Sequence, residues 1–238
     1  MKQINGSSTG ISKYEYDRRR FPLAEIVAQM FSMPVEQLER LHEALPQGYK
    51  MVQVADQLHV PFHRTFYDHV NPNGKNGFAQ CQTSLGREFL DTYDLLAREL
   101  IKVHLTEPSY FQVIPILRIQ IPKNVAIVGR HRDADGDGRH HPDEVNVFLP
   151  VTDTYRSNTI WAESERDKKD FAPLEAKVGE LIVWDGANLL HENRANDTGI
   201  SRVSFDFRLW PFSKYVRRDG VYSLIMGVPM VAGGYFKS

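Results

Sequence analysis

The stretch ELIVWDGANLLHENRANDTGISRVSFDFRL, residues 180–209, decides the fold. It predicts a strand, a turn containing glycine, a short strand that ends in His191, a polar loop, and a long alternating strand. The polar residues of that last strand share one face: Arg202, Ser204, Asp206 and Arg208. Apolar residues occupy the opposite face. A fully polar face with two arginines, near a histidine, predicts that this strand lines a hydrated cavity.

Short apolar stretches separated by turn residues continue upstream of this stretch. About eight of them lie between residues 108 and 212, which is typical of a barrel or jelly roll. We therefore expect a mainly β protein with flanking helices and a double-stranded β-helix core at 108–212. Residues 1–107 would form a helical support and lid region, and 213–238 a covering tail, within a single domain of 238 residues.

Helical spacing of apolar residues marks three segments of the N-terminal part. We expect helices over residues 22–31, 34–45 and 84–104, with Ser32 as the N-cap of the second. Residues 1–20 are polar, and we expect them to be partly disordered.

Composition excludes several classes of protein. The formal charge is -1 without a large basic block, so we expect no binding to nucleic acid. Nothing resembles a signal sequence or a membrane span, and the single cysteine, Cys81, fits a reducing compartment. We expect a cytoplasmic protein that acts on a small-molecule substrate and does not bind membranes. The apolar tail also allows a homodimer.

Three residues far apart in the chain offer a metal site. His131 and Asp133 form an H-x-D pair that points to one side of a strand, and His191 ends a later strand. Two histidines with one carboxylate leave positions open for other ligands, which is typical of non-haem Fe(II) oxygenases. We therefore predict that these residues hold iron and form the catalytic centre.

The strand after His191 adds a site for a carboxylate. Arg202 offers a planar pair of donors and Ser204 adds a hydroxyl on the same face. With these residues in this order, the sequence resembles the Fe(II)/2-oxoglutarate-dependent oxygenase superfamily, in its phytanoyl-CoA-hydroxylase-like branch. More closely, residues 131–164, HRDADGDGRHHPDEVNVFLPVTDTYRSNTIWAES, and 184–208, WDGANLLHENRANDTGISRVSFDFR, are similar to the StrG-like proteins of streptomycin-type biosynthetic clusters.

This resemblance implies an enzyme that uses Fe(II), the cosubstrate 2-oxoglutarate and O2 to hydroxylate a small polar metabolite, such as an amino acid or sugar in natural-product tailoring. It implies that Arg202 and Ser204 bind the far carboxylate of 2-oxoglutarate. Asp133 stands where the halogenases of the superfamily have a small residue, which disfavours chlorination. Asn146 and Thr159 are further candidates for cosubstrate contacts, although such residues often bond to backbone groups. The candidate substrate contacts are Arg118, Trp161, Glu163 and Arg208.

Other interpretations of the same residues remain open. Residues 133–144 match the EF-hand pattern D-x-D-x-D-G-x5-E, although both flanks look like strands. His141 and Asp143 form a second H-x-D pair. Asp206 and Arg208 are candidates for a structural ion pair.

Two broader alternatives concern the metal chemistry. Histidines 59, 63 and 69 are dense enough to suggest a second metal site, although a lid segment is the simpler interpretation. A cupin-type metal protein that is not an oxygenase, such as a sugar isomerase, epimerase or binding module, is the main alternative function. The Arg202-x-Ser204 pair argues against it, because an isomerase has no use for a 2-oxoglutarate clamp.

Overall fold

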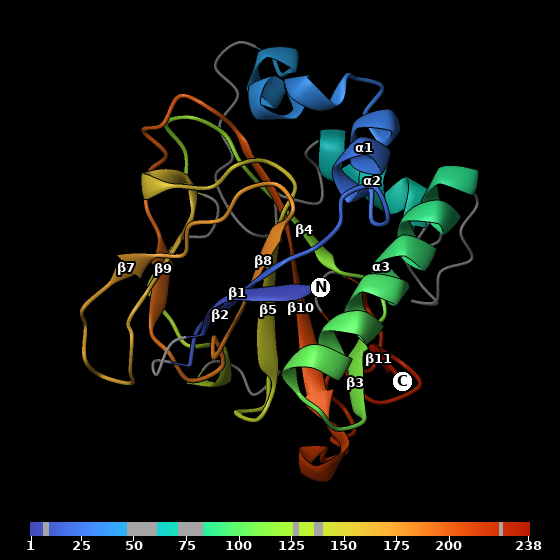
Figure 1. Cartoon of the computed structure of the whole chain (residues 1–238), viewed down its shortest axis with the longest axis vertical. Helices are drawn as coiled ribbons and strands as arrows, with labels where there is room; N and C mark the ends of the chain where they lie inside the picture. The colour runs from blue at the N-terminus through green and yellow to red at the C-terminus, as the bar shows by residue number, and fades with distance from the viewer. Residues whose placement is uncertain (7–9, 47–60, 71–82, 126–128, 136–139, 224–225) are drawn as a thin grey trace.

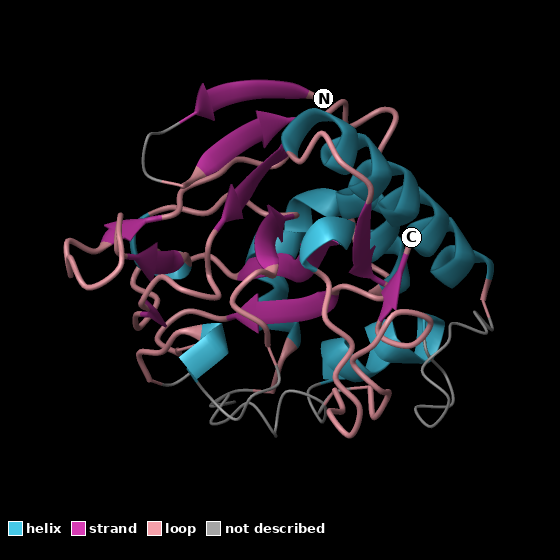
Figure 2. Cartoon of the chain, turned by 90° about the horizontal axis from the view of Figure 1, so that it is seen from below, coloured by secondary structure: helices cyan, strands magenta, loops and turns pink. Residues whose placement is uncertain are grey.

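The computed structural model describes residues 1–6, 10–46, 61–70, 83–125, 129–135, 140–223 and 226–238. The elements form three layers, with the helices on one side of a large sheet and a small sheet on its other side (Figure 1). The view from below shows the same separation, because the helices gather on one side of the strands (Figure 2).

The described strands of the large sheet pair antiparallel in the order β1-β2-β8-β5-β10-β3-β11, and β4 also pairs with β10. Its strands are β1 (Lys2–Gly6), β2 (Ser12–Glu15), β3 (Ser109–Gln112), β4 (Ile116–Gln120), β5 (Val145–Pro150), β8 (Glu180–Trp184), β10 (Arg202–Pro211) and β11 (Phe236–Lys237). The small sheet has the order β7-β6-β9, with β6 (Ile160–Ala162), β7 (Ala172–Pro173) and β9 (His191–Asn193).

The order in which the chain visits the two sheets identifies the type of fold that the core has. After β4 in the large sheet, the chain reaches the small-sheet side at His131, which forms a bridge with His191 of β9. It returns to the large sheet as β5, crosses to β6 and β7, returns as β8, crosses to β9, and ends in the large sheet as β10. This repeated crossing is the arrangement of a double-stranded β-helix, so the predicted fold class is confirmed.

Alternation along the strands sends side chains into two separate cores. Val203, Phe205 and Phe207 of β10 pack against the helices, as expected for one face of an alternating strand. Phe148 of β5 and Ile182 of β8 point to the other side and pack between the two sheets. The polar face of β10 therefore also lies between the sheets, where the cavity described below is found.

In the described ranges, the α-helices that cover the large sheet are α1 (Leu23–Met30), α2 (Pro61–Val70) and α3 (Ser84–His104). The predicted limits of α3 are confirmed, and its N-cap Thr83 accepts a hydrogen bond from the Gly86 amide at 2.9 Å. Gly86 is needed in this helix because a Cβ there would overlap the carbonyl oxygen of His69 in α2. Among the described residues, no helix combines the length and apolarity needed to cross a bilayer.

The predicted helix over 34–45 is instead a 3-10 helix, η1 (Val35–Ala44), with non-helical backbone angles at Arg40. The buried residues Leu38 and Leu41 are three positions apart, a step that fits the three residues per turn of a 3-10 helix as well as an α-helix. The prediction of Ser32 as N-cap was wrong: Pro34 holds that position, and Ser32 has a positive φ of 56°.

The expected disorder of residues 1–20 is also corrected. β1 and β2 extend the large sheet, since β2 pairs with β8, and Tyr14 and Tyr16 are buried. At the other end of the chain, β11 pairs with β3, and Met230 and Phe236 are buried. Both ends of the chain therefore add to the sheet and core.

One buried histidine gives the fold a measurable dependence on pH. His63 in α2 is 1% exposed, and burial, together with nearby Arg118, lowers its pKa to about 3. The unfolded side chain has a pKa of about 6.5, so between these values the unfolded state binds the extra proton and stability falls as the pH decreases. When the pH falls from 7 to 5, the wild type is therefore expected to lose about 2 kcal/mol more unfolding free energy than the variant His63→Leu. Urea denaturation at the two pH values measures this, and an equal loss in variant and wild type would contradict it.

Candidate metal centre

The two histidines of the predicted triad are held opposite each other by their own backbones. The His131 amide donates to the carbonyl oxygen of His191 at 3.0 Å, and the His191 amide donates back at 2.9 Å. This bridge places the two imidazole rings side by side, with centroids 4.3 Å apart. His191 begins β9 rather than ending a strand as predicted, and its side chain is buried, whereas that of His131 is 39% exposed.

Asp133 completes the group from the short 3-10 helix η3 (Asp133–Asp135). Its amide donates to the carbonyl oxygen of Gly186 at 3.1 Å, which fixes the loop against the turn before β9. Oδ1 of Asp133 lies 3.6 Å from Nε2 of His131 and 3.7 Å from Nε2 of His191. The three ligand atoms lie within 4.8 Å of one another, and no other such group occurs among the described residues.

The second oxygen of Asp133 is occupied by protein donors. Arg208 Nη2 donates to Oδ2 at 2.7 Å and Asn146 Nδ2 donates to it at 2.8 Å. Burial alone would raise the pKa of Asp133, but Arg208 and His131 outweigh burial and hold that pKa well below its usual range. The carboxylate is thus ionised, with Oδ1 turned toward the two imidazoles.

The far nitrogens of both imidazoles face backbone carbonyl groups. Nδ1 of His131 lies 3.3 Å from the carbonyl oxygen of Gly129, and Nδ1 of His191 lies 2.9 Å from that of Leu189. A proton on Nδ1 satisfies each contact and leaves the lone pair of Nε2 for a metal ion. The contact with Asp133 raises the pKa of His131, whereas burial lowers the pKa of His191.

A cavity extends from the triad along the polar face of β10. It is lined by Arg118, His131, Asp133, Asn146, Val147, Ile160, Trp184, His191, Asn193, Arg202, Asp206 and Arg208. Besides His131, six residues predicted from sequence for the metal, cosubstrate or substrate line this cavity: Asp133, His191, Arg202, Asn146, Arg118 and Arg208.

The predicted carboxylate clamp has unused donors. Arg202 is 1% exposed and Ser204 is fully buried, and within the described part of the chain neither Arg202 Nε nor Ser204 Oγ has a hydrogen-bond partner. Nη1 of Arg202 donates to the carbonyl oxygen of Asn158 at 3.3 Å, which anchors one side of the guanidinium. Burial lowers the pKa of Arg202 to about 10, so it is still a cation at neutral pH. A buried cation beside a buried hydroxyl, both with unused hydrogen-bonding capacity, is suited to bind an anionic ligand group.

The remaining charged residues of β10 pair differently from the sequence-based alternative. Asp206 forms an ion pair with Arg118 of the neighbouring strand β4, with Nε and Oδ2 2.9 Å apart. The suggested Asp206–Arg208 pair is therefore wrong, because Arg208 is bound to Asp133 and also lies 3.6 Å from Glu144. Asp206 thus pairs across the sheet with β4, whereas Arg208 pairs with the η3 turn and with Glu144, the residue before β5.

Ser204 is not among the residues that line the cavity, and neither are three further candidate contact residues. Thr159 is buried and donates its hydroxyl to the carbonyl oxygen of Leu174 at 2.6 Å. Trp161 donates Nε1 to the carbonyl oxygen of Arg156 and is covered by the Arg194 guanidinium, 3.5 Å from the ring centroid. Glu163 is buried and accepts hydrogen bonds from protein donors. The groups that would contact a ligand are thus already used in each of the three.

The two rival metal interpretations find no support in the geometry. The EF-hand pattern needs flanking helices, but Asp133 starts a single 3-10 turn and Glu144 is followed directly by β5. Asp137 and Gly138 of that pattern lie outside the described residues. Glu144 is fully buried and is contacted by His140 Nδ1 at 2.8 Å. His141 stacks on Trp210, with ring centroids 5.1 Å apart.

The suggested second metal site falls partly outside the described residues, since His59 is not among them. His63 is buried in α2, and His69 contacts the hydroxyl of Thr83 at 2.7 Å through Nδ1. Neither belongs to a group that could hold a metal ion in the described part of the chain.

One characterised relative covers almost the whole sequence. The chain is 34% identical over 225 residues to the streptomycin biosynthesis protein StrG of Streptomyces griseus, which spans 94% of this chain and 96% of the relative. The chain belongs to the StrG family. The resemblance seen in residues 131–164 and 184–208 is thereby confirmed, and it extends into the N-terminal half. No protein-family model matches the sequence.

Solved structures show weaker similarity to this StrG-family chain. The non-haem monooxygenase ThoJ in complex with nickel covers 85% of this chain and 75% of its own, with 14% identity and a TM-score of 0.49. A prolyl-4-hydroxylase of Pseudomonas putida has a TM-score of 0.44 at 14% identity, covering 86% and 94%. EctD of S. alaskensis with 2-oxoglutarate and 5-hydroxyectoine has a TM-score of 0.46 at 11% identity, covering 93% and 76%. Because these TM-scores and sequence identities are low, membership of the family rests on the sequence similarity to StrG alone.

Sequence reasoning missed one large residue of this StrG-family site. Trp184 belongs to the core between the two sheets, as its sequence context indicates, and the same side chain lines the cavity and meets the His191 ring edge-on, with centroids 4.9 Å apart. It lies opposite Asn146 in the register of β8 and β5. Its alternation with Ile182 signals the correct face, but only the strand register shows that this face reaches the metal ligands.

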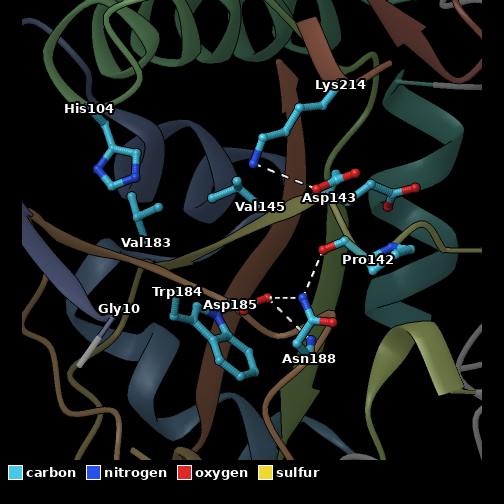
Figure 3. Close-up of a pocket in the computed structure, with 11 residues that line it drawn as sticks. Gly10, His104, Pro142, Asp143, Val145, Val183, Trp184, Asp185, Asn188 and Lys214 are labelled. Atoms are coloured by element: carbon cyan, nitrogen blue, oxygen red, sulfur yellow. Dashed lines mark hydrogen bonds and ion pairs between the residues drawn. The ribbon is translucent and has the colours of Figure 1, made fainter. Parts of the chain in front are cut away.

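Trp184 also lines another cavity, which is shown in Figure 3. Lys214 points toward Asp143, with Nζ and Oδ1 3.6 Å apart, and Asn188 donates to both Asp185 and the carbonyl oxygen of Pro142 at 2.8 Å. In the described part of the chain, none of the residues that line it has a buried side-chain nitrogen or oxygen atom that lacks a hydrogen-bond partner. It therefore lacks the unused donors that distinguish the cavity at the triad.

Proposed function

We propose that this protein is a non-haem oxygenase that depends on Fe(II) and 2-oxoglutarate and hydroxylates a small polar metabolite. The observation that carries the proposal is that one cavity is lined by the three metal-ligand residues and by Arg202, whose Nε has no hydrogen-bond partner among the described residues, as is also true of Oγ of Ser204 on the same face of β10. The first feature fits a metal ion, and the second fits a carboxylate that must lie near it.

The donor set fits Fe(II). His131, His191 and Asp133 would supply two imidazole nitrogens and one carboxylate oxygen from one side, and this triad with open positions is typical of Fe(II) oxygenases. When bound, iron and 2-oxoglutarate supply the oxidising power, using O2 and releasing succinate and CO2.

The chain's own residues orient these groups. Arg202 and Ser204 would hold the far carboxylate of 2-oxoglutarate through a charge-assisted pair of donors. Arg208 and Asn146 keep Oδ1 of Asp133 facing the histidines by holding Oδ2. Trp184 closes one wall against His191 and keeps water from that side of the ligand.

The polar character of the cavity supports a polar substrate. Arg118 and Asp206 form an ion pair on its wall, which offers both a cationic and an anionic partner to a substrate with amino, hydroxyl or carboxylate groups. The relative's role in streptomycin biosynthesis supports a place in natural-product tailoring. We infer an amino-acid-like or sugar-like substrate, and hydroxylation as the outcome.

Spectroscopy tests the proposal before the substrate is known. The purified protein, freed of metal and mixed with Fe(II) and 2-oxoglutarate without oxygen, is expected to develop a weak visible charge-transfer band. Admission of oxygen should then release succinate, and screening amino acids and sugars for faster release would identify the substrate class. Metal binding without the band and without succinate would favour the cupin-type alternative.

A further inference from the structure

Glu163 is a fully buried carboxylate that lies behind the metal ligands and does not line their cavity. Its Oε1 accepts hydrogen bonds from the Leu190 amide at 2.7 Å and from Arg132 Nη2 at 3.2 Å. Its Oε2 accepts from the Lys169 amide at 3.2 Å. Burial opposes the charge, but these donors outweigh burial and hold the pKa of Glu163 below its usual range.

The two partners of Oε1 adjoin the predicted metal ligands. Leu190 directly precedes His191, and Arg132 stands between His131 and Asp133. The Glu163 amide also donates to the carbonyl oxygen of Leu190 at 3.1 Å, so the Leu190 residue is held through both its amide and its carbonyl group. One carboxylate oxygen therefore joins the two separate chain segments that supply the triad.

Arg132 is the residue through which Glu163 contacts the His131–Asp133 segment. Its side chain is only 12% exposed and also contacts Asp167 at 2.6 Å and Asp135 at 3.2 Å. Those two carboxylates are 70% and 49% exposed, so among the described residues only Glu163 pairs with Arg132 inside the protein. Without Glu163, Arg132 would keep Asp135 of its own segment and the exposed Asp167 as partners, and neither connects it to the His191 segment.

We propose that Glu163 is a positioning residue that, together with the backbone bridge between His131 and His191, holds the His131–Asp133 segment against the His191 segment. The inference rests on the proposed metal site but not on the cosubstrate or the substrate. Groups behind metal ligands typically change metal affinity about 10- to 100-fold when they are replaced. Glu163 acts through its backbone and guanidinium contacts, and thus without touching the metal.

Metal affinity provides the test, with Co(II) as a visible probe titrated into metal-free full-length protein. Glu163→Gln keeps the size of the side chain and removes the charge and the second acceptor oxygen, and we expect it to weaken Co(II) binding about 10- to 100-fold. The matched control is Asp170→Asn. Asp170 accepts from the amide and hydroxyl of Ser164 in the same loop but reaches neither ligand segment, so we expect a change of less than about twofold.

Arg132→Ala tests the same link from its more accessible end and covers the case in which Glu163→Gln does not fold. In the double variant, the loss of Co(II) affinity should be clearly smaller than the product of the two single effects, because both changes break one contact. A purely structural role would lower the unfolding temperature of the metal-free protein but leave the Co(II) dissociation constant unchanged. That result, or equal weakening by Asp170→Asn, would overturn the inference. If the wild type itself binds no Co(II), the proposed metal site fails as well.

Discussion

Replacement of His131 by glutamine is expected to weaken Fe(II) or Co(II) binding more than about 100-fold and to abolish succinate release. The expected loss exceeds the 10- to 100-fold that is typical for residues behind the ligands, because a direct ligand atom is removed. His131 is the most suitable triad member to replace, since its side chain is 39% exposed and its backbone bridge to His191 is retained. Titration of the metal, followed by circular dichroism of the variant, measures the effect and checks the fold.

His141→Gln is the matched control, because His141 belongs to the neighbouring H-x-D pair with Asp143. Its ring packs on Trp210, and it does not belong to the group of metal ligands formed by His131, Asp133 and His191. The metal affinity of His141→Gln should therefore stay within about twofold of wild type. Should His141→Gln abolish metal binding while His131→Gln spares it, the assignment of the triad would be refuted.

Replacement of Arg202 by alanine is expected to raise the 2-oxoglutarate concentration needed for half-maximal succinate release at least about 30-fold. Truncating one partner of a buried charge pair costs about 2 kcal/mol or more, and about 1.4 kcal/mol corresponds to a factor of ten. The affinity for Co(II) alone should change little, since Arg202 does not contact the triad. This combination separates a cosubstrate clamp from a residue that only supports the fold.

Arg194→Ala serves as the control for Arg202. Arg194 follows β9, is 42% exposed, and pairs with Glu192 and Trp161 outside the cavity. Its loss should leave the requirement for 2-oxoglutarate unchanged. A protein whose activity is indifferent to 2-oxoglutarate both before and after Arg202→Ala would point to the cupin-type alternative.

The residues that face the cavity along β10 could be predicted from sequence because side-chain direction in a strand has a period of two. The same rule placed His131 and Asp133 together, although Asp133 lies in a 3-10 turn rather than a strand. The polar face of β10 was therefore visible without any knowledge of its partners. The contacts that these polar side chains make could not be predicted in the same way.

Contacts between strands depend on register, which the sequence of one strand does not specify. Arg208 was expected to meet substrate or Asp206, but the register places it opposite Asn146, and both bind Asp133. Glu163 was assigned to substrate because a buried carboxylate and a ligand-binding one look alike in sequence. The N-terminal strands were missed because their polar residues hide the burial of Tyr14 against β8.

The central place of β10 has a consequence for synthesis of the protein. This strand pairs with β3, β4 and β5 and carries Arg202, Ser204 and Arg208. While residues 202–211 are still inside the ribosome, the earlier strands lack their common neighbour and Asp133 lacks its cationic partner. The proposed metal site is therefore expected to form only after β10 has left the ribosome, and a nascent fragment that ends before residue 202 is expected not to retain the metal.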